Sequence, residues 1–111
     1  MNKINTIKDL INEAHQNAIN KGFWAVNQDI GNKLMLVNTE LVELFERVRK
    51  NQMNVPDEHC PQYANAKVEG ADGIIRLFDM FGYLGWSDMQ DVIEAKMAYN
   101  ISRPHLHNKQ F

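Results

Sequence analysis

The amino-acid sequence predicts an all-α fold, a four-helix bundle-like single domain over residues 1–111. Four stretches carry apolar residues at helical spacing, and each is bounded by a capping residue, a glycine or a proline. A chain of 111 residues corresponds to one domain with little core to spare, so burial through self-association would add to its stability.

The first helix is expected over residues 7–20, because Thr6 followed by Asp9 resembles an N-terminal cap and Gly22 is a suitable stop. The second is expected over residues 29–50. The spacing between its apolar residues alternates between four and three positions, as in a left-handed bundle: Ile30, Leu34, Val37, Leu41, Leu44 and Val48. A second apolar set lies off this stripe: Met35, Leu36, Val42 and Phe45. A helix that is apolar on more than one side predicts a second subunit, in a homodimer or a dimer of dimers.

The second half of the chain predicts two more helices after a long loop at residues 51–63. The third is expected over residues 64–84 and ends at Gly85. The fourth is expected from Asp88 to Ser102, after a capping box of Ser87 and Gln90. Its expected inner residues are Val92, Ile93, Lys96, Met97 and Asn100. Residues 103–111 form a polar and basic tail.

Composition excludes several classes of protein. A formal net charge of −2 excludes a general binder of nucleic-acid polymers read from charge alone. Cys60 is the only cysteine, so no intramolecular disulfide can form and a reducing cytoplasm is expected. No apolar run approaches the roughly 18 residues of a membrane span.

Two pairs of carboxylates predict a metal site. Glu40 and Glu43 are three residues apart, as are Glu69 and Asp72, so each pair projects from one side of its helix. If the two helices pack side by side, four oxygen ligands converge, and all-oxygen ligation favours Mg²⁺ or Mn²⁺ over iron or zinc. The simpler alternative is ordinary ion pairing four residues along each helix, from Glu43 to Arg47 and from Asp72 to Arg76.

The acids and their spacing resemble the signature of the MazG-like superfamily of all-α nucleoside triphosphate pyrophosphohydrolases, in small bacterial and phage-type members. Further segments share the resemblance: Gly22-Phe23-Trp24, Asn32-Lys33-Leu34-Met35-Leu36, Lys96-Met97-Ala98-Tyr99-Asn100 and Arg103-Pro104-His105-Leu106-His107. The chain departs from the family at Thr39, where the first glutamate is often doubled, and at Asn108, where glycine is frequent.

This resemblance implies Mg²⁺-dependent hydrolysis of a (deoxy)nucleoside triphosphate to the monophosphate and pyrophosphate, in nucleotide-pool house-cleaning. It assigns Glu40, Glu43, Glu69 and Asp72 to the metal, with Glu40 and Glu43 as first candidates for the catalytic base. A metal-assisted attack of water at the α-phosphate agrees with the chemistry of phosphoryl transfer, which needs positioning and charge stabilisation.

Cations and aromatic residues supply candidate substrate contacts. Lys96, Asn100 and Arg103 share one side of the fourth helix, and the resemblance favours phosphate binding over a simple response to the helix dipole. The same role is expected of Lys33, Arg76 and Lys109. Phe23 and Trp24 have two possible roles, stacking on the nucleobase or locking the first helix to the second. His15 either approaches the nucleobase or is a polar group with its hydrogen bonds satisfied on the first helix.

Two rival functions remain open at this stage. One is a non-catalytic helical interaction module whose acids form a solvated face. The other is a related enzyme restricted to a pyrimidine deoxynucleotide. Release of pyrophosphate from a panel of nucleotides distinguishes these possibilities.

Overall fold

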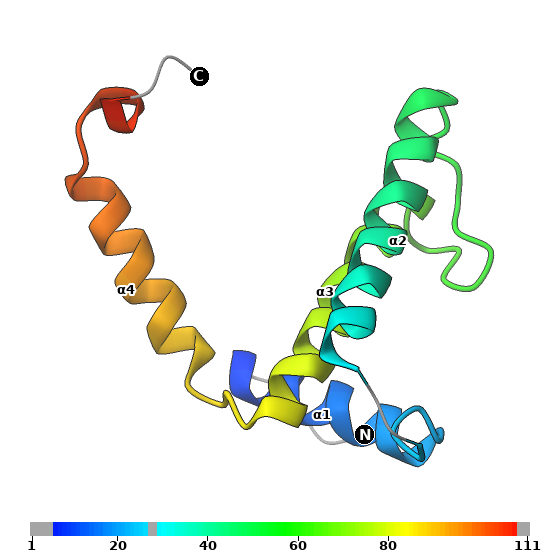
Figure 1. Cartoon of the computed structure of the whole chain (residues 1–111). Helices are drawn as coiled ribbons and strands as arrows, with labels where there is room; N and C mark the ends of the chain where they lie inside the picture. The colour runs from blue at the N-terminus through cyan, green and yellow to red at the C-terminus, as the bar shows by residue number, and fades with distance from the viewer. Residues whose placement is uncertain (1–5, 27–28, 109–111) are drawn as a thin grey trace.

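The computed structural model describes residues 6–26 and 29–108, which form four α-helices and one short 3-10 helix. In chain order these are α1 (Ile7–Asn20), α2 (Ile30–Arg49), α3 (Asn65–Leu84), α4 (Met89–Ser102) and η1 (His105–Asn108) (Figure 1). Within the described residues, strand-like pairing is limited to an isolated bridge between Pro56 and Ala64. The all-α prediction is confirmed, and each predicted helix matches the observed bounds to within one residue.

Local capping explains where most helices begin and end. Thr6 Oγ1 accepts a hydrogen bond from the N–H of Asp9 at 3.1 Å, as predicted. Asp29 caps α2 by accepting from the N–H of Gly31 at 2.9 Å. Gly85 ends α3 with a φ of 76°, a left-handed conformation that a residue without Cβ adopts at no steric cost.

The predicted capping box at the start of α4 is wrong. Asp88 is the N-cap and makes no side-chain capping hydrogen bond. The Oε1 atom of Gln90 instead accepts from the N–H of Ile7, at 3.4 Å. Gln90 therefore connects the first turn of α4 to the first turn of α1, because the orphan N–H groups of α1 offer it a donor.

The core lies where α1 crosses α3. Ile11 of α1 is fully buried, and it packs with Met80 and Phe81 of α3. Partly buried residues from all four helices surround this centre: Ile7, Ile30, Leu77, Phe78, Leu84 and Met89. Trp86, which follows α3, packs against Phe81 with the ring centroids 5.8 Å apart. Both α1 and α2 lie against α3, which is thus the central helix of the fold.

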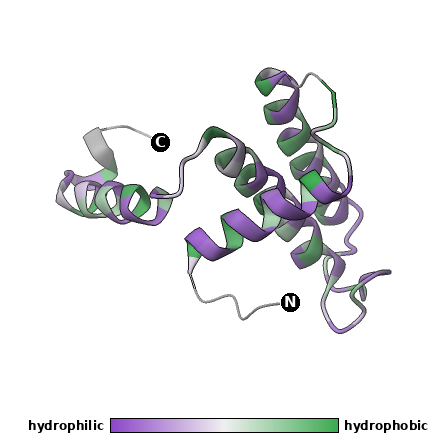
Figure 2. Cartoon of the chain, turned by 90° about the horizontal axis from the view of Figure 1, so that it is seen from below, coloured by the Kyte–Doolittle hydropathy of each residue, from purple (hydrophilic) through white to green (hydrophobic). Residues whose placement is uncertain are grey.

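α4 extends away from the other three helices (Figures 1 and 2). It contacts α1 near its start, and it has no buried residue. The Cα radius of gyration is 16.5 Å, against about 13 Å for a compact chain of this length. The predicted inner side of α4 is therefore wrong within the single chain, since Val92 and Met97 are 48% and 60% exposed. The reason is that α4 leaves the other helices after its start, so these positions lie beyond the surface on which its first turn packs.

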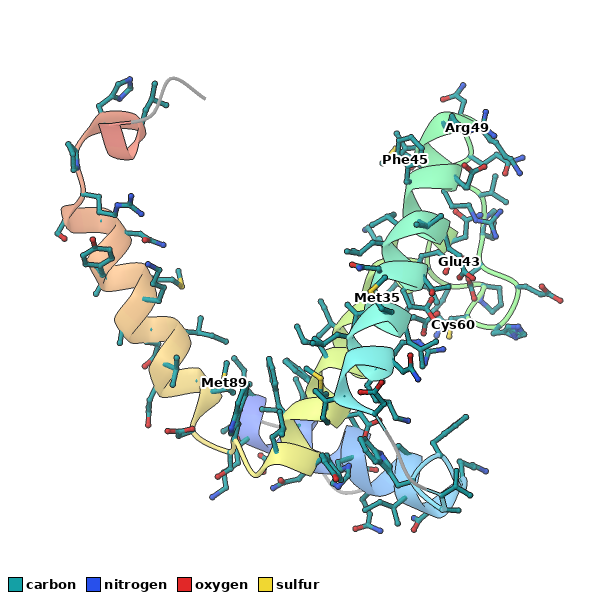
Figure 3. The ribbon with its side chains drawn as sticks, viewed as in Figure 1. Met35, Glu43, Phe45, Arg49, Cys60 and Met89 are labelled. Atoms are coloured by element: carbon teal, nitrogen blue, oxygen red, sulfur yellow. The ribbon has the colours of Figure 1, made fainter. Side chains whose placement is uncertain are left out.

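α2 exposes a broad apolar face. Its only buried residue is Glu40, and its apolar side chains are between 39% and 60% exposed at seven positions: Leu34, Met35, Leu36, Leu41, Val42, Phe45 and Val48. Figure 3 shows Met35 and Phe45 on the side of α2 away from Glu43. The predicted seam of α2 is thus only partly covered within the chain. None of the described helices is both long and apolar enough to cross a membrane.

Candidate metal centre

Three glutamates from two helices form the centre of the candidate site. Glu40 and Glu43 come from α2, and Glu69 comes from α3. One carboxylate oxygen from each lies within 4.8 Å of the others. The spacing of three residues places the α2 pair on one side of the helix, and the packing of α2 on α3 adds the third.

Asp72, one turn after Glu69, lies beside this group but outside the three-oxygen cluster. It is close enough to Glu40 and Glu69 for their charges to act on it. The structure therefore brings together three of the four predicted metal ligands and places the fourth at their margin.

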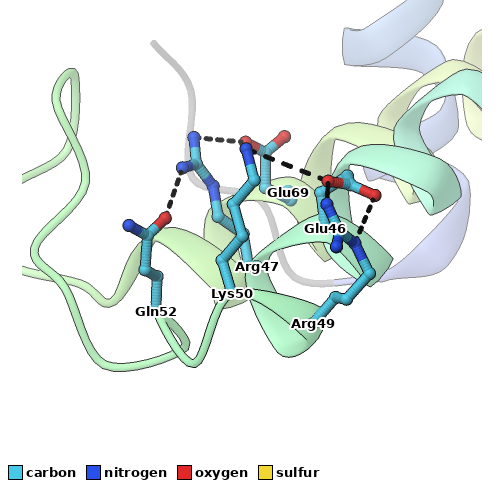
Figure 4. A network of polar contacts seen from close by, with 6 residues as sticks. All are labelled: Glu46, Arg47, Arg49, Lys50, Gln52 and Glu69. Carbon is cyan, nitrogen blue, oxygen red and sulfur yellow. Dashed lines mark hydrogen bonds and ion pairs between the residues drawn. The ribbon is translucent and has the colours of Figure 1, made fainter.

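Two arginines bind the cluster across the helix interface. The Nε atom of Arg76 donates to Glu40 Oε1 at 2.7 Å, and Arg47 Nη2 lies 3.6 Å from Glu69 Oε1. Figure 4 shows the second pair at the end of α2. The alternative of ion pairs along each helix is not what the structure shows, because each arginine pairs with a glutamate of the other helix.

The protonation behaviour of the acids reflects their crowding. The pKa of Glu43 is raised by hydrogen bonding with Glu69, by burial and by the negative charge of Glu40. Burial is the largest cause that raises the pKa of Asp72, followed by the charges of Glu40 and Glu69. Hydrogen bonding and burial are thus the leading causes of the two raised pKa values, and repulsion between the carboxylates adds to them.

The geometry of the three glutamates fits a hard divalent cation. Octahedral oxygen ligands at about 2.1 Å from Mg²⁺ are about 3–4 Å apart. The oxygens here lie within 4.8 Å of one another, so small side-chain rotations close the set.

A cavity of about 370 Å³ opens on the α1 side of the acids. Its acidic and basic lining comes from Glu40, Asp72, Arg76, Asp79 and Lys21. The remaining lining is amide or apolar: Ala14, Asn17, Ala18, Phe23 and Ile75. The lining from α2 and α3 is thus mostly charged, whereas the lining from α1 combines two alanines with polar side chains.

A second cavity, of about 450 Å³, lies between the acids and the α2–α3 loop. Glu43, Glu69 and Asp72 line it, together with loop residues such as Asp57. The loop is held in place by the N–H of Asp57, which donates to the carbonyl of Tyr63 at 2.9 Å. Asp72 lines both cavities, so the carboxylates form the wall that the two share.

Asn65 is a further polar residue in the loop-side cavity. It is 5% exposed, and its Oδ1 atom is buried with no hydrogen-bond partner in the described part of the chain. A buried acceptor without a donor is costly, so this amide is suited to a bound ligand or water.

The predicted base-contacting residues Trp24 and His15 lie behind the wall of the α1-side cavity. Trp24 stacks on Tyr83 with centroids 4.2 Å apart, and Lys33 Nζ sits 4.3 Å from the Trp24 ring centroid. Because Tyr83 occupies one face of the Trp24 indole, Lys33 lies over the other face, and both faces are covered. Neither Trp24 nor His15 lines the cavity, whereas Phe23 does.

The three predicted phosphate contacts on α4 are not brought to the acids within the chain. None of Lys96, Asn100 and Arg103 lines either cavity, and α4 stands apart from α2 (Figure 1). Lys96 and Arg103 lie 4.6 Å and 5.6 Å from the ring centroid of Tyr99. Asn100 Oδ1 is buried without a partner among the described residues. Lys109 falls outside the described residues.

Sequence reasoning missed Asp79, Lys21 and Asn17 as cavity residues. Asp79 lies seven residues after Asp72 and so on the same side of α3, which is the signal in the sequence that could have identified it. Lys21 and Asn17 carry no recognisable motif, because their position depends on how α1 crosses α3.

Comparison of the chain with models of known protein families, with curated proteins and with solved structures finds no match. The functional argument therefore depends on the geometry of the site and on the resemblance of its motifs.

Proposed function

We propose that this chain is a Mg²⁺-dependent hydrolase that converts a (deoxy)nucleoside triphosphate to the monophosphate and pyrophosphate, in the cytoplasm. The observation that carries the proposal is the convergence of Glu40, Glu43 and Glu69 within 4.8 Å, at the wall between two cavities. The spacing of these acids is also that of the MazG-like pyrophosphohydrolases.

The α1-side cavity suits the substrate. Arg76 provides positive charge beside the carboxylates, Lys21 provides it on the α1 side, and Ala18, Ile75 and Phe23 provide apolar surface. Binding sites for small molecules combine an apolar lining with a few charged groups in this way. We place the triphosphate beside Arg76 and the nucleoside toward α1.

Arg76 has groups free for the substrate. Its Nε atom is used by Glu40, but its two terminal nitrogens make no hydrogen bond with a described residue. A guanidinium presents its donors in a fork that matches phosphate oxygens. We assign Arg76 to a phosphate oxygen, with Glu40 holding the side chain in position.

Glu40, Glu43 and Glu69 would hold the cation, with Mn²⁺ as a possible substitute for Mg²⁺. When bound there, Mg²⁺ offsets the charge of the triphosphate and polarises its phosphoryl oxygens. Glu43 is exposed and lines the loop-side cavity, so we assign it to the attacking water. Asp72 lines both cavities and is positioned to orient that water.

The exposed apolar faces support self-association as a homodimer or a dimer of dimers. Seven large side chains of α2 and several of α4 are uncovered within the chain, including Ile101 at 85% exposure. Apolar patches of this kind mark interaction surfaces. A partner's α4 would also supply Lys96 and Arg103 to the phosphates, which the chain's own α4 does not reach.

The rival interaction module is less well supported. A solvated acidic face requires exposed acids, whereas Glu40 is 7% exposed and paired with Arg76. Restriction to a pyrimidine deoxynucleotide is a narrower form of the same activity, and the nucleotide panel tests it directly.

The experiment incubates the purified chain with each ribo- and deoxynucleoside triphosphate, with Mg²⁺ or with a chelator. Monophosphate and pyrophosphate are expected in equal amounts, and only with the metal. Oxygen-labelled water should place its label in the monophosphate, because attack is at the α-phosphorus. Glu43→Gln should abolish turnover with its helical circular dichroism retained, whereas the matched control Glu94→Gln, on exposed α4, should remain active. No pyrophosphate from any nucleotide by a folded chain would refute the proposal.

A further inference from the structure

Asp79 is a carboxylate held in a fixed orientation at the edge of the α1-side cavity. Its Oδ1 atom lies 2.8 Å from His15 Nδ1 and accepts from Trp24 Nε1 at 2.9 Å. The side chain is only 14% exposed. Two donors on the same oxygen restrict the carboxylate to one rotamer, since rotation would break both hydrogen bonds.

The surroundings reinforce this orientation. Trp24 is itself fixed between Tyr83 and Lys33, and Lys33 also donates to the carbonyl of Phe23 at 3.2 Å. His15 sits directly against α3, because a Cβ added at Gly82 would lie 2.5 Å from the histidine Cβ. The donors that hold Asp79 are therefore rigid.

The second oxygen of Asp79 is left for a ligand. Oδ2 makes no hydrogen bond with any described residue, although Asp79 lines the cavity and most of its side chain is buried. Oδ2 is not one of the buried atoms that lack a partner, so solvent reaches it and it is open to the N–H or O–H of a ligand in the cavity. An acceptor in a site rejects ligands that lack the matching donor.

We infer that Asp79 is a specificity-determining residue whose Oδ2 atom accepts a hydrogen bond from the nucleoside of the substrate, while His15 and Trp24 act as positioning residues behind it. This inference rests on the proposed function for the identity of the ligand. The donor is either an exocyclic amino group of the base or a hydroxyl of the sugar. Both have the same chemistry at Oδ2, and substrate analogues distinguish them.

Asp79→Asn is the decisive variant. With the amide oxygen in the place of Oδ1, it keeps both hydrogen bonds from His15 and Trp24 and converts the free acceptor into a donor. The preferred nucleotide should lose about tenfold to hundredfold in kcat/KM, mainly through KM, because a donor then faces a donor. The matched control is Asp91→Asn on exposed α4, which should leave kcat/KM unchanged.

Paired substrates identify the donor. If it is the base amino group, the loss should affect dCTP and dATP and be reduced or reversed for dUTP and dITP. If it is a sugar hydroxyl, the loss should affect every base and disappear with dideoxynucleotides. An equal loss for all nucleotides, including the dideoxy forms, or no loss at all, would overturn the inference.

Binding of α,β-imido nucleotides, followed as a thermal shift, separates this inference from the proposed function. Binding that depends on Asp79 without any turnover would support the inference and refute the hydrolase. Turnover with unchanged nucleotide preference in Asp79→Asn would do the reverse. If Asp79→Asn loses its helical signal, Trp24→Phe serves as the second variant, because it removes one of the two donors to Asp79. A smaller loss in kcat/KM for the same substrates is then expected. An unchanged nucleotide preference in Trp24→Phe would count against the inference.

Discussion

Neutralising Glu43 should stabilise the metal-free protein at neutral pH. Its carboxylate oxygen lies within 4.8 Å of those of Glu40 and Glu69, and two unit charges at that distance repel by about 0.9 kcal/mol in water. Glu43 is exposed, so the aqueous value applies, and salt reduces it further. With two such neighbours, Glu43→Gln should raise the free energy of unfolding by about 1–2 kcal/mol.

This gain should depend on pH in a definite direction. The pKa of Glu43 is raised above the 4.5 of a free glutamate side chain, first by its hydrogen bond with Glu69, so the folded state binds this proton more tightly than the unfolded state. The resulting loss of stability in the wild type begins as pH rises through about 4.5 and is complete above the raised pKa. The difference in free energy of unfolding between wild type and Glu43→Gln should therefore be small near pH 4 and largest at neutral pH.

Thermal unfolding in a chelator, followed by circular dichroism, measures the effect. A gain of about 1–2 kcal/mol corresponds to an increase in Tm of roughly 4–10 °C for a domain of this size. Added Mg²⁺ should raise the Tm of the wild type, because it binds only the folded carboxylates, and should raise that of Glu43→Gln less. Glu94→Gln, which removes the same charge from α4, is the control and should show neither effect. A lower Tm for metal-free Glu43→Gln at neutral pH would refute the reasoning.

Three further outcomes are expected. Arg76→Gln should lower the free energy of unfolding by about 1–3 kcal/mol, since it leaves a buried glutamate of α2 unpaired; equal denaturation midpoints would contradict this. Gly82→Ala should lower the free energy of unfolding by about 1–3 kcal/mol, because its Cβ would overlap His15. Gly70→Ala is the control: its Cβ would have no neighbour within 4 Å, so it should raise the free energy of unfolding by up to about 1 kcal/mol in the same denaturation assay. Phe45→Glu should reduce the molar mass in light scattering if α2 forms the subunit interface, and an unchanged mass would exclude this face.

The helices were predictable from sequence because their signals are local. Thr6, Gly22 and Gly85 act within one turn of the backbone, and the bounds they predict are those observed. The relation between Glu40 and Glu43 was equally local, since it follows from helical periodicity alone. The approach of Glu69 needed only that two consecutive long helices pack side by side.

Contacts that depend on the angle between helices were not predictable. The alternative ion pair of Arg76 with Asp72 along α3 does not form, because the packing of α2 on α3 brings Arg76 to Glu40. The role of Asp79 depends on His15 and Trp24, which lie 64 and 55 residues away in the chain. No periodicity within one helix records such an arrangement.

The direction of α4 was a third property beyond local patterns. Its apolar residues do not form a one-sided stripe, and the described contacts that connect it to the rest of the fold include those of Gln90 and Met89 near its start.

The junction between α3 and α4 has a mechanical consequence. Gly85 turns the chain through a left-handed residue, and beyond the first turn of α4 no packing surface fixes the bearing of the helix. A different direction of the chain at this joint would displace Lys96 and Arg103 much more than Met89, whereas the glutamates, held by α2 and α3, would keep their positions. The distance between these cations and the carboxylates is therefore set at the α3–α4 junction rather than at the site itself.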